Sequence, residues 1–343
     1  MCKRVQPALF TKESLPHLCH LWLDGQSVWA YDGELGINAP LKTDLRVGLP
    51  GAVLIGLVDK SKSVKEIELL QSDEAVTLKA GKMRTDLAYL PDSDRPQWPD
   101  DLLVDSPVPI NQEFLSCLKA GMVATGNNEN RPDFMGTTLI MDGEELQLYT
   151  SDGATASWLN CTLPENWEVP RVGWPRRFCE QLIKQADAKL NGKELLHMSR
   201  GSVLAELNET LILGRNLDIR SPINYEQMFS RMLPEDWEKK VYPIPKDFGE
   251  ALGRSKVLLS KNKDAAIMID ADGLGKLVLS TVAGNGKVDD RLDIDGEQEP
   301  YQLRFTPRLI ERVLPHVDRM YMGSRHMIFS STSSGLVHIV SAG

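Results

Sequence analysis

The hydrophobic pattern of the chain repeats one motif: a strand-like run, a helix-starting residue, and then apolar residues at helical spacing. Helix starts are predicted at Pro50, Asn111, Pro175, Pro245 and Pro307, which lie 61 to 70 residues apart. Proline suits the first helical position and asparagine is a good cap, so both residue types mark such starts. A near-constant period of this length indicates a repeated architecture.

Each repeat is predicted to contain one helix followed by three or four short strands. In the third repeat Phe178, Leu182 and Ala186 share one helical face, as expected for a helix that packs on a sheet. Strand-like runs follow this helix at 194–199, 202–208 and 210–219.

The first repeat is shorter than the others. A strand-like run at 5–10 is followed only by the segment 14–20 before the next predicted strand. This spacing leaves little room for a full helix, so we expect the first helix to be shortened or lost.

Asp-Gly dipeptides between β-type runs mark hairpin turns. Their first occurrences in successive groups, at Asp24, Asp142 and Asp272, lie 118 and 130 residues apart, about twice the shorter period. Two half-units therefore form one domain, and the chain is predicted to be an α+β protein of three similar domains. The predicted domains are 1–105, 106–236 and 237–343.

Composition restricts the protein class. The longest apolar run, 52–58, is too short for a membrane-spanning helix, and no apolar stretch follows Lys3 and Arg4 as in a secretory signal. The five cysteines are scattered, without a C-x-x-C pair. We therefore expect an intracellular, reduced protein that has no membrane segment, no structural zinc and no cofactor.

Charge is distributed unevenly along the chain. The net charge is −9, yet the helix-containing segments 171–195, 246–263 and 306–320 together carry +7. One basic helix face is ordinary, but three in a regular repeat favour a shared cationic surface. Such a surface on an acidic protein is suited to contact DNA phosphates without reading sequence.

Four stretches resemble the bacterial DNA sliding clamp, the beta subunit of the DNA polymerase III holoenzyme. The family has three similar domains, each of two helix-plus-sheet half-units, and two chains close head to tail into a ring around duplex DNA. The resemblance implies a non-catalytic, cytoplasmic processivity factor that forms a homodimer, tethers DNA polymerase and other replication or repair proteins, and is loaded by a clamp loader ATPase. The stretches are 141–153, 223–234, 259–280 and 291–319.

The resemblance also implies three sets of site residues. The lining of the hole, expected to contact DNA, comprises Arg176, Arg177, Lys184, Arg254, Lys256, Lys261, Arg308 and Arg312. The pocket for partner peptides comprises Phe134, Ser151, Asp152, Gly153, Ala154, Ala156, Arg231, Met232, Pro234, Val340 and Ser341. The subunit interface comprises Leu54, Ile55, Val58, Lys60, Val257, Leu258, Asp289 and Asp290.

The chain departs from the family pattern in three places. It ends in LVHIVSAG instead of the family's Met-Pro-Met-Arg-Leu, and Ala154 to Ala156 stand where an arginine usually follows the Asp-Gly turn. The first helix is short. These departures favour a divergent member, such as one encoded by a phage and acting in an infected bacterial cell.

The sequence is also compared with two other classes of function, an enzyme and a partner-binding protein that does not encircle DNA. An enzyme is disfavoured because the chain has no phosphate-loop, serine-hydrolase, HExxH or dinucleotide-binding motif. A metal-binding role for His17, Cys19 and His20, or for the aspartates near Asp289, is less favoured than a purely structural role for the same residues. The nearer alternative is a clamp-like protein that recruits or sequesters clamp-binding partners without encircling DNA, because fold alone does not fix function.

Overall fold

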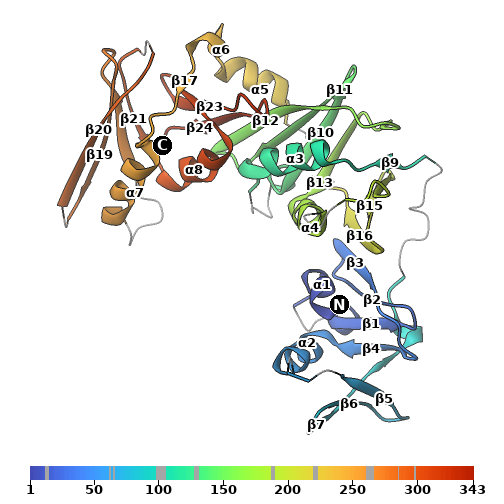
Figure 1. The fold of residues 1–343 in the computed structure, drawn as a ribbon. Helices are drawn as coiled ribbons and strands as arrows, with labels where there is room; N and C mark the ends of the chain where they lie inside the picture. The colour runs from blue at the N-terminus through green and yellow to red at the C-terminus, as the bar shows by residue number, and fades with distance from the viewer. Residues whose placement is uncertain are drawn as a thin grey trace. The chain divides into compact units, whose positions relative to one another are not determined.

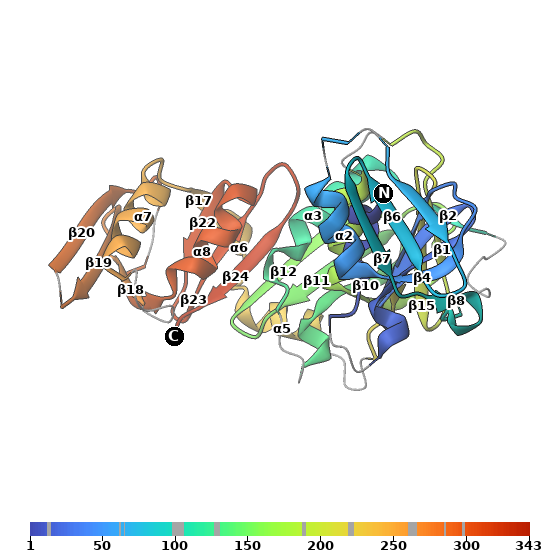
Figure 2. The same ribbon diagram turned by 90° about the horizontal axis from the view of Figure 1, so that it is seen from below.

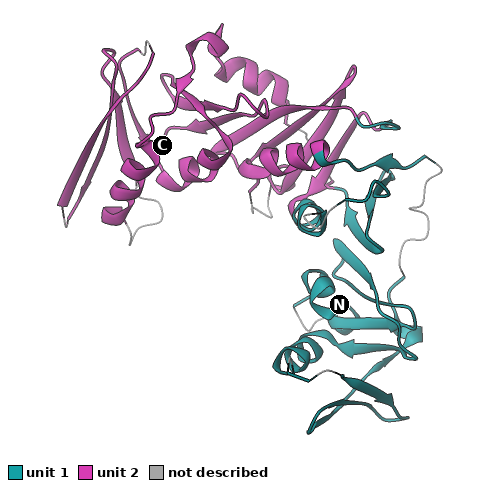
Figure 3. Ribbon diagram, in the orientation of Figure 1, with its two compact units in different colours: residues 1–112, 164–168, 177–216 teal, residues 113–163, 169–176, 217–343 magenta. Residues whose placement is uncertain are grey.

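The computed structural model describes residues 1–11, 15–61, 63–64, 66–97, 106–126, 131–186, 190–218, 223–259, 266–284, 286–296 and 299–343. The chain forms two compact units (Figure 3). Unit 1 consists of residues 1–112, 164–168 and 177–216, and unit 2 of residues 113–163, 169–176 and 217–343.

The five helices predicted from the repeat are confirmed. Four of them begin at the predicted residue or one residue after it. The helix predicted to start at Pro245 begins at Phe248, whose amide donates to the carbonyl of Pro245. The helices are α2 (Gly51–Lys60), α3 (Gln112–Gly121), α4 (Arg176–Ala186), α7 (Phe248–Leu259) and α8 (Pro307–Val313). The other helices are α1 (Cys2–Val5), α5 (Tyr225–Met232) and α6 (Trp237–Lys240).

The predicted strand at 5–10 is wrong. The four-residue helix α1 is followed there by a 3-10 turn, Gln6–Ala8. Pro7 explains the difference, because it has no N–H to donate to a neighbouring strand and its φ suits a helical turn. Val5 and Ala8 are nevertheless fully buried. The apolar residues therefore predicted burial correctly, but the segment they belong to is helical and not a strand.

Unit 1 is built on a nine-stranded antiparallel sheet in the order β8-β4-β1-β2-β3-β16-β15-β14-β9. Strands β14, β15 and β16 confirm the three strands predicted after α4. A separate sheet contains β5 (Glu68–Gln71), β6 (Val76–Ala80) and β7 (Met83–Leu87). The strands of the large sheet are β1 (His20–Asp24), β2 (Ser27–Tyr31), β3 (Leu35–Pro40), β4 (Arg46–Pro50), β8 (Leu90–Pro91), β9 (Val108–Pro109), β14 (Leu195–Met198), β15 (Ser202–Leu207) and β16 (Thr210–Arg215).

Unit 2 is built on an eight-stranded antiparallel sheet in the order β13-β10-β11-β12-β24-β23-β22-β17. Its strands are β10 (Gly136–Asp142), β11 (Glu145–Ser151), β12 (Thr155–Thr162), β13 (Arg171–Pro175), β17 (Tyr242–Pro243), β22 (Arg319–Met322), β23 (His326–Ser330) and β24 (Val337–Ser341). A second sheet has the order β20-β19-β18-β21, and α7 packs on it (Figure 1, Figure 2). Its strands are β18 (Ile267–Ala271), β19 (Lys276–Ala283), β20 (Gly286–Asp293) and β21 (Tyr301–Phe305).

The large sheet of unit 2 has helices on both faces, with α3 and α8 on one side and α5 and α6 on the other (Figure 1). Side chains of β11 alternate accordingly. Leu148 packs where α3 ends, so closely that a Cβ on Gly121 would lie 2.1 Å from its Cδ2. Tyr149 points to the opposite face and stacks on Tyr225 of α5, with ring centroids 4.9 Å apart.

Strands of the predicted middle domain, 106–236, contribute to both large sheets. Residues of β16 pair with β3, where Ile212 is opposite Ile37, and residues of β12 pair with β24, where Ala156 is opposite Ile339. These pairings join segments that are far apart in sequence. Each large sheet therefore combines strands from two of the predicted domains.

Within the described residues, no helix combines the length and apolar character needed to cross a membrane. The described residues also contain no group of three or more His, Cys, Asp or Glu side chains arranged to hold a metal ion. His17 and Cys19 lie in a 3-10 turn, Pro16–Cys19, and His20 begins β1.

Candidate partner-binding and DNA-contact sites

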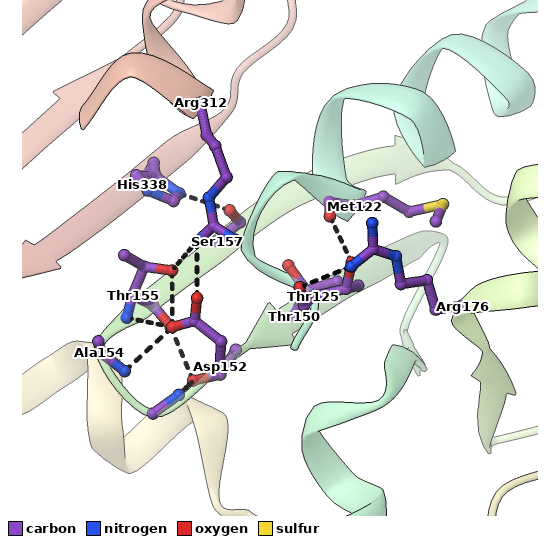
Figure 4. A network of polar contacts seen from close by, with 12 residues as sticks. Met122, Thr125, Thr150, Asp152, Ala154, Thr155, Ser157, Arg176, Arg312 and His338 are labelled. Atoms are coloured by element: carbon purple, nitrogen blue, oxygen red, sulfur yellow. Dashed lines mark hydrogen bonds and ion pairs between the residues drawn. The ribbon is translucent and has the colours of Figure 1, made fainter. Parts of the chain in front are cut away.

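The turn between β11 and β12 is held by hydrogen bonds of the Asp152 side chain, seen in Figure 4, and of the Ser151 side chain. Asp152 Oδ1 accepts hydrogen bonds from the amides of Ala154 and Thr155, at 3.0 and 2.7 Å. Ser151 Oγ donates to the carbonyl of Thr155 and accepts from the amide of Gly153. Gly153 has a φ of +88°, a conformation that glycine adopts without steric cost. The turn is therefore rigid and its backbone donors are satisfied.

Arg312 ties α8 to this turn. Its Nη2 donates to Asp152 Oδ2 at 2.6 Å and to Thr155 Oγ1 at 3.2 Å. Burial alone would raise the pKa of the Asp152 carboxyl, but the hydrogen bonds from Arg312, Thr155 and Ala154 outweigh it, and the pKa lies below its ordinary value. Arg312, predicted to contact DNA, thus has a counterion within its own unit.

A buried histidine lies next to this ion pair. His338 Nδ1 is 2.7 Å from Ser157 Oγ, and the side chain has no exposed surface. Burial and the charge of Arg312 lower the pKa of His338 to about 3. The imidazole is therefore neutral near pH 7, and the ion pair between Asp152 and Arg312 is not opposed by a second buried cation.

Replacing Asp152 with asparagine is expected to lower the free energy of unfolding by about 1–2 kcal/mol near pH 7, because a hydrogen-bonded, partly buried charge pair is lost. The lowered pKa of Asp152 sets the pH dependence: its stabilisation is present above the unfolded pKa of roughly 4 and disappears as pH falls through the folded pKa. Urea unfolding of both proteins across this range measures the difference. A difference that stays constant down to the lowest pH would contradict the assigned ion pair.

The structure brings part of the predicted partner pocket together. Phe134 packs against the turn, where a Cβ on Gly153 would lie 3.1 Å from its Cε2. Arg131, which the sequence did not single out, places its guanidinium 4.2 Å from the Phe134 ring centroid and pairs with Asp133. The attraction between the Arg131 guanidinium and the Phe134 ring depends on how the fold places them, and no sequence pattern marks it.

The remaining pocket positions differ in accessibility. Arg231 is exposed on α5, while Met232 and Pro234 are half-buried, and Met232 packs on the aromatic core that Tyr149 and Tyr225 share. Val340 is paired opposite Thr155 and is fully buried. Its assignment to the pocket wall needs correction, because a side chain in the core presents no surface to a peptide. The neighbouring Ser341 is half-buried, whereas Ala156 and Ser151 are nearly buried.

The predicted lining residues of unit 1 lie on α4. Arg177 and Lys184 are both exposed. Arg177 pairs with Asp32, with Nη2 and Oδ2 2.6 Å apart. Lys184 lies on the same exposed side of the helix, seven residues further on, which corresponds to two helical turns.

Three of the predicted lining residues of unit 2, including Arg312 described above, pair with carboxylates. Arg254 forms a two-pronged contact with Asp290, and Lys256 Nζ is 2.7 Å from Glu311 Oε2. Arg176 donates to the carbonyl of Thr125 at 3.4 Å. Arg308 is exposed on α8, and Lys261 lies outside the described residues.

The predicted interface residues separate into buried and exposed groups. Leu54 and Ile55 of α2 are 2% and 5% exposed. Their assignment to the interface is corrected, because they fill the core of unit 1 and offer almost no surface to another chain. Val257 of α7 is 70% exposed and Leu258 is half-buried. Val53, which is 50% exposed, was missed because helical spacing alone did not fix which face of α2 is buried.

The other interface candidates are charged or marginal. Val58 is half-buried and Lys60 is exposed at the end of α2. Asp290 is used by Arg254, and Asp289 pairs with Lys287 at 2.6 Å, so both aspartates have cations within their own unit. The hydrogen bonds from Lys287 and, to a lesser extent, Ser280 lower the pKa of the Asp289 carboxyl.

Known proteins resemble this chain in sequence and fold. No protein-family model matches it. It is 23% identical over 283 residues to the beta sliding clamp of Vibrio cholerae, covering 82% of this chain and 72% of that protein. It is 22% identical over 299 residues to the beta sliding clamp of Synechococcus elongatus, covering 83% of this chain and 76% of that protein.

Two solved structures extend the likeness to the whole chain. The Caulobacter crescentus beta sliding clamp gives a TM-score of 0.84 at 18% identity, covering 100% of this chain and 95% of that one. The DNA polymerase III beta subunit of Thermotoga maritima gives 0.82 at 20% identity, with the same coverage. The fold is therefore the DNA-clamp fold, and in sequence the chain is similar to the bacterial beta sliding clamps.

Proposed function

We propose that this protein is a DNA sliding clamp, a ring of two chains that encircles duplex DNA and tethers a DNA polymerase. The observation that carries the proposal is the clamp fold over 100% of the chain, supported by sequence similarity to two beta sliding clamps. The protein would hold its partners in place and catalyse no reaction itself. Like other proteins that act on bacterial replication, it would work in the cytoplasm.

The contact with DNA is proposed to be electrostatic and independent of sequence. Basic side chains on α4 and α8, with Lys184 and Arg308 as exposed examples, would meet phosphates directly or through water. Because the whole chain carries a net charge of −9, tight binding over its other surfaces is disfavoured. Enclosure of the DNA and the phosphate contacts of these basic side chains would then act together to retain the protein.

The partner site is proposed to lie beside the rigid turn at Asp152. Phe134 and Met232 provide apolar surface, and Arg231 provides an exposed cation at the end of α5. A short peptide with apolar anchors suits such a surface. In the cell, a clamp loader ATPase would open the ring for loading onto DNA and would supply the ATP hydrolysis, since this chain has no phosphate-binding loop.

The subunit interface is proposed to include the exposed end of α7. Val257→Asp is expected to shift the protein from two-chain rings toward single chains at low micromolar concentration, because a charge replaces an exposed apolar contact. Leu274→Asp is the matched control, since Leu274 is 88% exposed in the turn between β18 and β19. Sedimentation velocity measures the shift, and class averages from negative-stain electron microscopy distinguish rings from crescents. Equal dimerisation of both variants would remove α7 from the interface.

One observation favours the alternative, a clamp-like protein that recruits or sequesters partners without encircling DNA. Arg254, Lys256 and Arg312 each have a carboxylate within hydrogen-bond distance. Paired cations attract phosphates less strongly than unpaired ones. The two functions differ in whether circular DNA retains the protein, which the alternative does not require.

A further inference from the structure

A groove lined by aromatic side chains lies on unit 2, between α5 and the strands β10, β11 and β12. Its larger hollow has a volume of about 990 Å³. Tyr149 lies at its centre, with ring centroids 4.9 Å from Tyr225, 6.5 Å from Trp158 and 6.0 Å from Phe229. A second hollow of about 310 Å³ shares Trp158 and Trp237 with the first. The two hollows are therefore neighbours, and we call the larger one the aromatic groove.

The aromatic groove differs from the predicted partner pocket. Of the eleven positions assigned to that pocket, only Pro234 lines the larger hollow. The groove uses the side of α5 that carries Tyr225 and Phe229, whereas Arg231 lies on the opposite side of the helix, as helical spacing requires. Both sites could be occupied at once.

The rim of the groove is acidic. Asp142, Glu226 and Glu235 are exposed carboxylates at its edge, while Arg171 is the one cation among the described residues that line the larger hollow. The Arg171 guanidinium is engaged, donating to the carbonyl of Ile223 at 3.2 Å. The groove therefore attracts positively charged groups and repels acidic ones.

The wall of the groove contains apolar surface and, beneath it, a hydrogen-bond donor without a partner. Trp158 Nε1 is buried and finds no acceptor within the described part of the chain. A buried donor without an acceptor is costly, so a carbonyl that reached it would gain free energy. Trp and Tyr faces also bind guanidinium and ammonium groups by cation–π contact.

We propose that the aromatic groove binds an extended segment of a partner protein that carries an aromatic or aliphatic anchor beside arginine or lysine. The anchor packs on Trp158 and Trp237, which are only partly buried, and the cation lies among the carboxylates of the rim. A backbone carbonyl of the segment accepts from Trp158 Nε1. The proposal goes beyond the clamp function and does not depend on encirclement of DNA.

The test starts from a random dodecapeptide library on phage, selected against the full chain and then, as synthetic labelled peptides, measured by fluorescence anisotropy. We expect a class of enriched peptides with arginine or lysine next to an aromatic or aliphatic residue. Their affinity should fall about tenfold or more in Glu226→Lys, which loses a rim carboxylate, and in Trp237→Ala, which loses indole surface. A tenfold change corresponds to about 1.4 kcal/mol.

The controls separate this groove from the other pocket. Glu226 is exposed, so its substitution is expected to leave the fold intact, which circular dichroism checks. Arg231→Glu makes the opposite side of α5 acidic and should leave this class of peptides bound within about twofold. The proposal is overturned if no enriched peptide is sensitive to Glu226→Lys, or if the sensitive peptides are acidic. If the protein bound these peptides but did not encircle DNA, only the proposed clamp function would be overturned.

Discussion

Gly136→Ala is expected to lower the free energy of unfolding of unit 2 by about 3 kcal/mol or more. A Cβ on Gly136 would lie 1.9 Å from the backbone oxygen of Trp174. This oxygen belongs to β13, whose Pro175 is paired opposite Gly136, so no side-chain rotation relieves the clash. The strands β10 and β13 must separate, which also loosens Trp174, a fully buried side chain of the core.

The matched control is Gly253→Ala on the helix α7 of the same unit. Gly253 has no neighbouring atom within 4 Å of its added Cβ, and alanine is favoured over glycine in helices by about 1 kcal/mol. Hydrogen–deuterium exchange of peptides from β10 and β13 in urea reports the stability of unit 2. If both variants exchange at the wild-type rate, the close approach of these two strands is incorrect.

Reversing the charges of Lys184 and Arg308 to glutamate is expected to shorten retention on closed circular DNA by about tenfold or more. Both side chains are exposed on helices, α4 and α8, that the proposal places toward DNA. Each phosphate contact removed also lowers the slope of log affinity against log salt by about 0.9. The double variant should therefore bind more weakly and depend less on salt.

The control reverses the same amount of charge on another surface. Lys239 and Lys240 lie on α6, on the other side of the large sheet of unit 2 from α8 (Figure 1). Their replacement by glutamate should leave both retention and its salt dependence close to wild type. Equal losses in the two double variants would mean that net charge, and not a defined lining, governs retention.

The repeat in the sequence predicted the helices well because local signals determine where they begin. Proline and asparagine marked α2, α3, α4 and α8 within one residue, and strand-like runs correctly predicted β14, β15 and β16. Local signals failed at residues 5–10, where apolar content was mistaken for a strand. Pro7 was the residue that argued for a helical turn.

The arrangement of the sheets could not be predicted from local patterns. The pairing of β12 with β24 joins Ala156 to Ile339, and such contacts across long sequence separations leave no periodic trace. The ion pair of Arg312 is a second contact that local sequence patterns do not predict. Its position in a basic helix indicated DNA contact, while its partner Asp152 is 160 residues away in sequence.

Retention on circular and on linear DNA distinguishes a ring that encircles DNA from a protein that only binds its surface. Diluting the protein until the ring dissociates and concentrating it again with a nicked circular plasmid allows rings to close around DNA without a loader. Gel filtration then separates plasmid-bound protein from free protein. We expect the protein to elute with the circular plasmid and to be released once a restriction enzyme linearises it. Protein that never elutes with the circle, or that remains equally bound to linear DNA, would contradict encirclement.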